Sequence, residues 1–257
     1  MLGGVEDPIG ERYISVLASE GFDYVELPLA QVMDLSDHQF NQLLILLQNN
    51  SIPCLSCNNF FPATIRLTGN QVDYLLIEKY VEKSMRRASL LGADIIVFGS
   101  SGAKNISSGF PYRLAYHQIV ETLQIVEKYA ARYNIQIAVE PLNRTESNII
   151  CNLSEGNQLV MDVDRPHIHL LVDYYHMNMV NDSLNTLNEV MPEIIHVHFA
   201  EPAGRKFPNP NNLNIYKNFF QVLLGNEYNN SVSIEAYTSD YIKDIRRSIY
   251  LMREMIS

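Results

Sequence analysis

The chain is poor in cysteine, and this limits how it can be stabilised. Its 257 residues include three cysteines, an odd number that is far too small for a disulfide framework. Cys54 and Cys57 form a C-x-x-C pattern in the apolar run IPCLSC, where a regular strand points residues three apart to opposite faces. A zinc site of four thiolates would need a second pair, which the sequence lacks. We therefore expect both cysteines to be core residues.

Long apolar segments and basic residues are also scarce. No apolar stretch approaches the roughly 20 residues that span a bilayer, and the first residues, MLGGVEDPIGER, lack the basic start and apolar centre of a signal peptide. The 19 Lys and Arg against 29 Asp and Glu give a formal net charge of −10, which disfavours a surface for nucleic acid phosphates. We expect a cytoplasmic protein with neither a nucleic acid nor a membrane as partner.

Helical and strand-like patterns alternate along the chain from residue 11 onward. We expect eight helices, at 11–20, 36–49, 71–91, 111–133, 153–163, 182–190, 215–224 and 240–256. Between them lie seven apolar runs: FDYVEL, IPCLSC, DIIVFG, IQIAVE, HIHLLVD, EIIHVHF and VSIEAY. This alternation is typical of parallel sheets, and the length fits the roughly 250 residues of a closed barrel. We predict an α/β fold, a single TIM (β/α)8 barrel domain over residues 1–257.

The first strand of that barrel is the element that the pattern does not supply. Only MLGGV precedes the first helical segment, so the first strand is either very short or missing from this chain. We favour the second alternative, in which the chain starts at an internal methionine. The barrel would then have a gap between its last strand and the run DYVEL, with unpaired edges on both sides.

Four apolar runs end on a side chain that can bind a metal or transfer a proton. They close on Glu140, Asp173, His198 and Glu235. Packing gives a core strand no reason to end this way, because burying an unpaired carboxylate costs several kcal/mol. Any one of them alone could be a solvated residue at the start of a loop. Their spacing, roughly 30 residues each as in a βαβ unit, instead favours one shared site at the carboxyl ends of the strands.

The residue types of this predicted site indicate its chemistry. Two glutamates, one aspartate and one histidine supply mostly hard oxygen donors, which suit Mn²⁺, Mg²⁺ or Co²⁺ better than a metal that seeks thiolates. Zn²⁺ could still bind. Glu26 ends its strand toward the same pocket and could line it. His196 points the same way as His198 along the strand, and it is either a hydrogen-bond partner that supports the site or a hydrogen-bonded core residue. His167 and His169 precede the end of their strand and are expected to be structural.

The motifs around these residues resemble a known family. VEPLNRTESNIICN, LLVDYYHMNM, HVHFAEPAGR and IEAY are similar, in order and spacing, to motifs of the xylose-isomerase-like sugar phosphate isomerase/epimerase family, nearest its D-tagatose/D-psicose 3-epimerase branch. The resemblance implies a divalent metal, Mn²⁺ first of all, bound by Glu140, Asp173, His198 and Glu235. It implies substrate contacts from Glu146, His176 and Arg205.

The same resemblance implies a reaction and a class of substrate. Glu140 and Glu235 would act as acid and base in an epimerisation at the carbon next to a carbonyl, through a metal-bound enediolate. The substrate would be a small sugar or sugar phosphate, and the chain could form a dimer or tetramer. Two alternatives remain: a hydroxypyruvate isomerase or inosose-type isomerase or dehydratase, and a barrel that binds sugar without catalysis.

The sequence departs from the family pattern in three places. Six residues, 199–204, separate His198 from Arg205, one more than the branch usually shows, so the reach of Arg205 to the substrate is open. IEAY stands where an E-P pair is more familiar. The loop FGSSGAKN is rich in glycine and serine and carries Lys104, so its backbone amides could cradle a phosphate.

Overall fold

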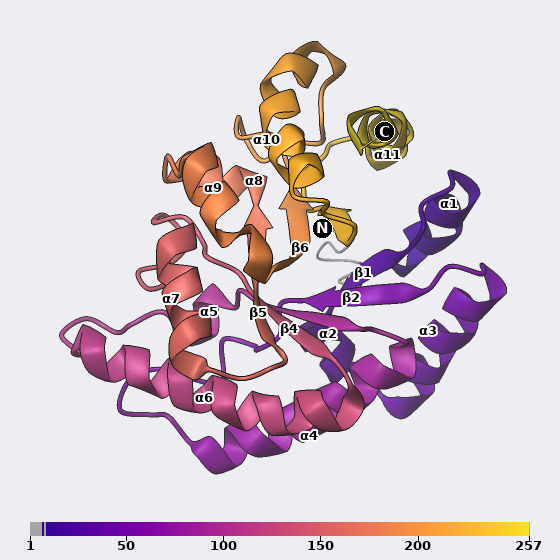
Figure 1. Cartoon of the computed structure of the whole chain (residues 1–257). Coiled ribbons are helices and arrows are strands. Elements are labelled where there is room, and N and C mark those ends of the chain that lie inside the picture. Colours follow the sequence, from indigo (N-terminus) through magenta and orange to yellow (C-terminus); the bar gives the residue numbers. More distant parts are fainter. Residues whose placement is uncertain (1–6, 8, 257) are drawn as a thin grey trace.

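The computed structural model describes residue 7 and residues 9–256 of the chain. Seven parallel strands hydrogen-bond in sequence order and curve into a nearly closed barrel (Figure 1). The strands are β1 Val25–Pro28, β2 Cys54–Asn58, β3 Ile95–Phe98, β4 Gln136–Val139, β5 Ile168–Asp173, β6 Ile194–Phe199 and β7 Ser231–Ile234. All seven predicted strands and the barrel fold are thus confirmed. The segment MLGGV, which the sequence offered as a very short first strand, lies outside the described residues.

An outer layer of helices surrounds the strands (Figure 1). The eight predicted helices are α1 Ile14–Ser19, preceded by a 3-10 turn at Glu11–Tyr13, α3 Asp37–Asn49, α4 Tyr74–Leu91, α6 Tyr112–Tyr133, α7 Leu153–Val163, α9 Leu184–Val190, α10 Leu213–Gly225 and α11 Tyr241–Ile256. Further 3-10 turns lie at Met191–Glu193 and Pro210–Asn212. Ser36 and Gln39 form a capping box at the start of α3. None of the described helices has the length and apolar character needed to cross a membrane.

Three short helices were not predicted, and each follows the carboxyl end of a strand. They are α2 Leu29–Asp34 after β1, α5 Ser101–Lys104 after β3 and α8 Tyr174–Met179 after β5. Each contains six residues or fewer, so none is long enough to show the helical repeat of apolar residues on which sequence reading depends. These helices surround the end of the barrel where the predicted site lies.

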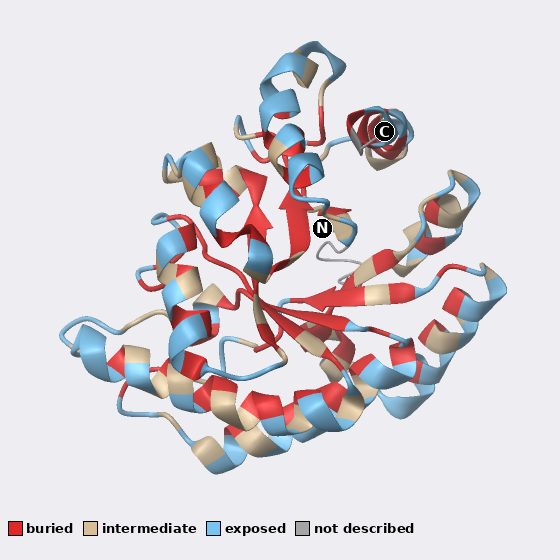
Figure 2. Cartoon of the chain, in the orientation of Figure 1, coloured by how far each residue is buried: buried red, intermediate tan, exposed pale blue. Residues whose placement is uncertain are grey.

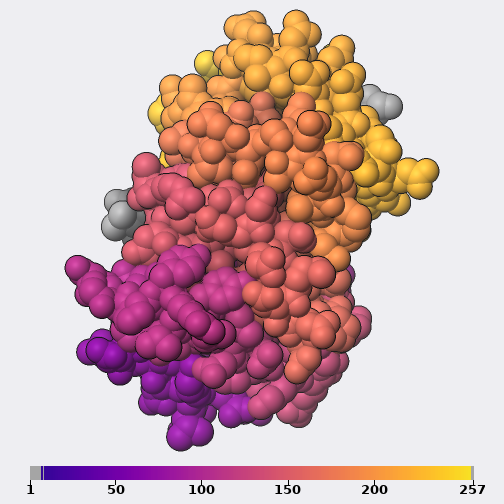
Figure 3. Space-filling view, turned by 60° about the vertical axis from the view of Figure 1, so that its left-hand side comes forward, coloured from indigo at the N-terminus to yellow at the C-terminus, as the bar shows by residue number. Residues whose placement is uncertain are grey.

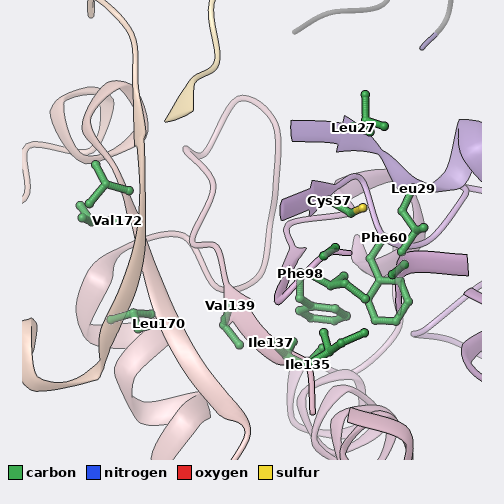
Figure 4. Packing of buried hydrophobic residues seen from close by; sticks show 14 of the residues in the cluster. Leu27, Leu29, Cys57, Phe60, Phe98, Ile135, Ile137, Val139, Leu170 and Val172 are labelled. Carbon is green, nitrogen blue, oxygen red and sulfur yellow. The ribbon is translucent and has the colours of Figure 1, made fainter. Parts of the chain in front are cut away.

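Alternation along the strands separates two layers of buried side chains. One face of each strand packs against the helices, as Leu27, Phe98, Ile137 and Val172 do (Figure 4). The strands are mostly buried, apart from the edge strand β7, which is largely half-buried (Figure 2). The opposite face fills the barrel with a small second cluster, which consists of Ile95, Val97, Ala138 and Leu171, with Ile195 against it. Because successive residues of a strand alternate between faces, the residues two positions beyond Ala138 and Leu171 also point inward.

The pair Cys54 and Cys57 corrects one detail of the sequence reading. The two sulfur atoms lie 3.9 Å apart rather than on opposite faces. The register explains this, since Val25 pairs with Cys54 and the next residue, Glu26, pairs with Ser56, so β2 contains one extra residue here. Such a bulge breaks the regular alternation. Both thiols are free and buried, as expected of core residues.

The barrel has two sheet edges within the described residues, because β1 and β7 do not pair with each other. A cavity of about 780 Å³ lies between them, and Ile234 and Met252 are among the residues that line it. Side chains bridge this gap: the Tyr24 hydroxyl is 2.9 Å from Ser233 Oγ, and Ser233 also donates to Glu26. In the space-filling view, residue numbers increase along the molecule from its indigo end to its yellow end (Figure 3). This reflects the sequential order of the strands in the sheet.

Close packing of α7 on the sheet gives a test of this fold. A Cβ atom at Gly156 would lie 2.6 Å from Pro141 Cγ and 2.7 Å from Leu170 Cδ1, closer than real side chains approach. We expect Gly156→Ala to lower the free energy of unfolding by about 1–3 kcal/mol, measured by urea denaturation. Gly225→Ala is the control, because nothing lies within 4 Å of its Cβ position. Equal losses in both variants would contradict the packing.

Candidate metal centre

The four predicted strand endings meet in one place. Glu140 follows β4, Asp173 ends β5, His198 lies near the end of β6 and Glu235 follows β7. One ligand atom from each lies within 4.8 Å of the others. Glu140 and Asp173 lie two residues beyond the inward-facing Ala138 and Leu171, and His198 pairs with Asp173 on the neighbouring strand and so points the same way. Ser233 pairs with His198 in turn, which directs Glu235, two residues later, into the barrel as well. The sequence reading that joined them into one site is therefore supported by their geometry.

His198 is the centre of the cluster and is fully buried. Its Nδ1 atom lies 3.1 Å from Glu140 Oε1 and 3.1 Å from Glu235 Oε2. Burial alone would lower the pKa of His198, but attraction to Glu26 and hydrogen bonds with the nearby carboxylates raise it well above its usual value. Burial would likewise raise the pKa of Glu235, yet the hydrogen bond and charge of His198, with the charge of Arg205, lower it to about 2.

The two carboxylate oxygens of Asp173 make different contacts. Oδ1 accepts hydrogen bonds from the backbone N–H groups of Tyr175 and His176, at 2.7 and 3.4 Å, and so caps the start of α8. Oδ2 is buried and has no hydrogen-bond partner among the described residues, with Arg205 Nη2 at 3.5 Å as an ion-pair neighbour. Burial raises the pKa of Asp173, and the charges of Glu140 and Glu235 raise it further.

The residues present fit a hard divalent cation. Three carboxylates face one another, two of them buried and that of Glu235 partly buried, so their mutual repulsion disfavours full ionisation unless positive charges join them. The unpartnered Oδ2 of Asp173 points to the same need, because buried polar atoms are normally hydrogen-bonded or bound to a metal. Oxygen donors with one imidazole match the preferences of Mn²⁺, Mg²⁺ or Co²⁺.

Arg205 reaches the cluster despite the longer connection that precedes it. Its Nη2 lies 2.6 Å from Glu235 Oε2, and its Nη1 lies 3.4 Å from Glu146 Oε2. The chain makes a tight turn before the side chain, where Gly204 and Arg205 both have left-handed backbone angles, with φ of 81° and 49°. The backbone N–H of Tyr237 donates to the Arg205 carbonyl at 2.6 Å and fixes the turn against the segment after β7.

His176 is held in one tautomer by a residue that sequence reading did not single out. The backbone N–H of Asn143 donates to His176 Nδ1 at 3.1 Å. Since that N–H can only donate, Nδ1 must accept and the ring proton belongs on Nε2. Nε2 is buried without a hydrogen-bond partner among the described residues, 3.6 Å from Asp173 Oδ2 and 4.0 Å from Glu146 Oε2. The asparagine of the motif VEPLNR was the available signal.

Lys104, in the loop FGSSGAKN that could cradle a phosphate, is turned away from any ligand that the loop amides could bind. The residues of this loop make the short helix α5, and the amides of residues 103–105 donate to the carbonyls of Ser100 and Ser101. Lys104 is fully buried, and its Nζ donates to the Glu140 carbonyl at 3.2 Å. Burial lowers the pKa of Lys104 to about 8, despite the opposing charge of Glu140. The lysine supports the backbone behind the cluster rather than facing a ligand.

The neighbouring histidines divide as the sequence suggested. His196 joins Glu26 at 2.8 Å inside the barrel, next to His198. His167 instead pairs with Glu127 at 2.8 Å and His169 lies 3.7 Å from a glutamate, both at the start of β5. These two are structural, as expected.

Comparison with known proteins assigns the fold to a family. The family described as xylose isomerase-like TIM barrel matches residues 14–255. The chain belongs to this family. The resemblance recognised from the four motifs is thereby confirmed at the family level, and the curated relatives are sugar epimerases.

Two curated relatives illustrate the range of similarity. The chain is 29% identical over 109 residues to 3-dehydro-D-guloside 4-epimerase of Escherichia coli K12, a match that covers 42% of this chain and 41% of that protein. It is 25% identical over 229 residues to D-psicose 3-epimerase of Ruminiclostridium cellulolyticum, covering 88% of this chain and 77% of the relative. The chain thus spans about two fifths of the first relative and about three quarters of the second.

Solved structures show the same barrel. The D-psicose 3-epimerase of Clostridium cellulolyticum H10 with D-tagatose superposes with a TM-score of 0.84 at 20% identity, over 96% of this chain and 94% of that one. The 3-keto-D-glucoside 4-epimerase of E. coli, in its apo form, gives a TM-score of 0.81 at 20% identity, over 95% and 94%. At this level of identity the likeness establishes the fold.

The position of Glu140 depends on a glycine in the next strand. Gly99 follows β3, and a Cβ atom there would overlap Oε2 of Glu140. We expect Gly99→Ala to displace this carboxylate and weaken Mn²⁺ binding about tenfold or more, measured by isothermal titration calorimetry. Gly225→Ala adds the same methyl group where nothing lies within 4 Å. If both variants bind Mn²⁺ as the parent does, the position of Glu140 does not matter for binding.

Proposed function

We propose that this chain is a divalent-metal-dependent sugar epimerase that inverts a ketose at C3, with residues 1–257 acting as one barrel domain. The observation that carries the proposal is the buried cluster of three carboxylates and one imidazole at the carboxyl end of the barrel. Its position agrees with active sites of such barrels. Relatives named D-psicose 3-epimerase and L-ribulose 3-epimerase support the class of reaction.

The metal would be held by Glu140, Asp173, His198 and Glu235, and Mn²⁺ suits this donor set best. When bound, a divalent cation supplies electrostatic stabilisation for negative charge that develops on neighbouring oxygens of the sugar. The protein contributes a fixed geometry, because the backbone cap on Asp173 and the contacts of His198 orient two ligands in advance.

Glu140 and Glu235 have the further task of moving a proton. A C3 epimerisation must remove the proton from one face of the sugar carbon and return one to the opposite face. Two carboxylates that come from different strands, β4 and β7, can flank a substrate in this way. The pKa of Glu235, lowered to about 2, means that this carboxylate is ionised and can receive a proton, although it is a weak base at that pKa, and Glu140 would serve on the other face.

Three further side chains would bind the substrate. The Nε2–H group of His176 is a buried donor without a partner in the described structure, so it is free to donate to a sugar oxygen. Arg205 supplies a fixed positive charge beside the cluster and lies 5.1 Å from the ring of Tyr175. Glu146 contacts Arg205 and, as an acceptor, can receive a hydrogen bond from a sugar hydroxyl.

The charges of the cluster favour an unphosphorylated ketose. Arg205 is already paired with Glu235 and Glu146, and Lys104 is buried behind Glu140. A phosphate group here would face several carboxylates. Neither Arg205 nor Lys104 would be free to pair with it. A neutral sugar avoids this repulsion and uses the hydroxyl donors and acceptors that the site offers.

A substrate panel tests the reaction. With Mn²⁺ in D₂O, we expect D-fructose or D-tagatose to give its C3 epimer with deuterium at C3, read by NMR. A chelator should abolish the exchange and added Mn²⁺ should restore it. The panel includes ketose phosphates and hydroxypyruvate. Turnover of hydroxypyruvate alone would support the isomerase alternative, and ketose binding without exchange would support a non-catalytic barrel.

Charge-neutral variants test the two proposed proton carriers. We expect Glu140→Gln and Glu235→Gln each to slow exchange at C3 by about 10²- to 10⁴-fold, the usual contribution of a general acid or base. Glu193→Gln is the control, because this glutamate pairs with His169 at the opposite end of the barrel. Exchange at the parent rate in either test variant would refute the two-carboxylate scheme.

A further inference from the structure

Glu26 is a buried carboxylate inside the barrel that the proposed reaction does not use. It lies on β1, and its side chain is 8% exposed. Its Oε2 atom has three hydrogen-bond neighbours, which are Ser56 Oγ at 2.6 Å, Ser233 Oγ at 2.8 Å and His196 Nε2 at 2.8 Å. These contacts satisfy one oxygen fully and hold the carboxylate in a fixed orientation.

The other oxygen of Glu26 faces His198. Oε1 lies 2.9 Å from His198 Nε2, within ion-pair distance, although the N–H direction is not that of a well-aligned hydrogen bond. Nε2 has no alternative partner among the described residues. Since an ionised carboxylate can only accept, this contact favours the ring form that carries its proton on Nε2.

The opposite nitrogen, Nδ1, is hydrogen-bonded to Glu140, and a bound cation would take the place of the proton there while the Nε2 proton stays with Glu26. Nδ1 of His198 is the atom that faces Glu140 and Glu235, at 3.1 Å from each. We infer that Glu26 is a positioning residue, which orients His198 and keeps its Nδ1 lone pair directed at the cation of the proposed centre. The inference rests on the proposed function, because it concerns how one ligand of that centre is prepared. Carboxylates that accept from metal-bound histidines orient the ring and raise its basicity.

A second reading of the same residues is a separate metal site. Ligand atoms of Glu26, His196 and His198 lie within 4.8 Å of one another. Hydrogen bonds already occupy this group, however, since Oε2 of Glu26 has three neighbours and His196 Nδ1 lies 2.7 Å from Ser231 Oγ. His198 Nε2 lacks a hydrogen bond but faces the Glu26 carboxylate at 2.9 Å, whereas Asp173 Oδ2, in the first cluster, has no hydrogen bond and lies 3.5 Å or more from its ion-pair neighbours. The contrast favours a supporting role for Glu26 over a ligand role.

Metal affinity gives the first test. We expect Glu26→Gln to weaken Mn²⁺ binding by about 10- to 100-fold in calorimetry, because a neutral amide polarises the imidazole less than a carboxylate. Ser56→Ala is the matched control, since it removes a donor to Oε2 and leaves the Oε1 contact with His198 in place. Its affinity should stay close to that of the parent. Parent-like affinity in Glu26→Gln would overturn the inference.

The NMR spectrum of His198 gives a second test. It uses the parent protein, so it needs no folded variant. In the Zn²⁺-loaded parent, labelled with ¹⁵N-histidine, we expect His198 to show a metal-bound Nδ1 and a proton on Nε2. A metal-bound Nε2, or two Zn²⁺ ions per chain with Glu26 needed for the second, would overturn the inference. If the parent binds neither Mn²⁺ nor Zn²⁺, both the proposed function and the inference fail. If the parent binds metal and the Glu26→Gln variant binds it with the same affinity, the inference alone fails.

Discussion

The gathering of three carboxylates, two buried and one partly buried, around one buried imidazole is the constraint on which the site depends. Each carboxylate loses its hydration, and their charges repel one another unless positive groups compensate them. Compensation is uneven: His198 and Arg205 both contact Glu235 and bring its pKa to about 2, whereas Asp173 keeps an oxygen without a hydrogen bond and has a raised pKa. A divalent cation beside Asp173 would complete the balance, which is why the cluster fits a metal better than a purely structural ion-pair network.

Backbone groups, more than side-chain packing, fix the direction of the polar groups around that cluster. Asp173 is oriented by the first amides of α8, His176 by the amide of Asn143, and Arg205 by a turn that Tyr237 holds through its own N–H. Backbone donors move little once the barrel is formed, so the side chains that they hold are preorganised. The loops after the strands therefore hold the polar side chains of the site in fixed orientations, which longer and more flexible loops would not do.

Sequence patterns predicted what depends on repetition and missed what depends on a single local geometry. The strands and the shared site followed from apolar runs that end on Glu140, Asp173, His198 and Glu235, because alternation and the spacing of βαβ units are regular. The bulge in β2 that brings Cys54 and Cys57 together leaves no such pattern, and neither do the short helices α2, α5 and α8 that follow strands directly. The burial of Lys104 depends on how α5 folds back under Glu140, which composition alone does not reveal.

The interior polar network links the metal centre to the edges of the sheet. Within the described residues β1 and β7 share no backbone pairing, yet Ser233 of β7 contacts both Tyr24 and Glu26 beside the cavity between these strands. Buried hydrogen bonds of this kind are strong where water is excluded and costly to break singly. Because Glu26 also contacts His198, separating β1 from β7 would withdraw support from His198 first. Glu140 and Asp173 belong to the central strands β4 and β5 and would be affected later than the members on β6 and β7.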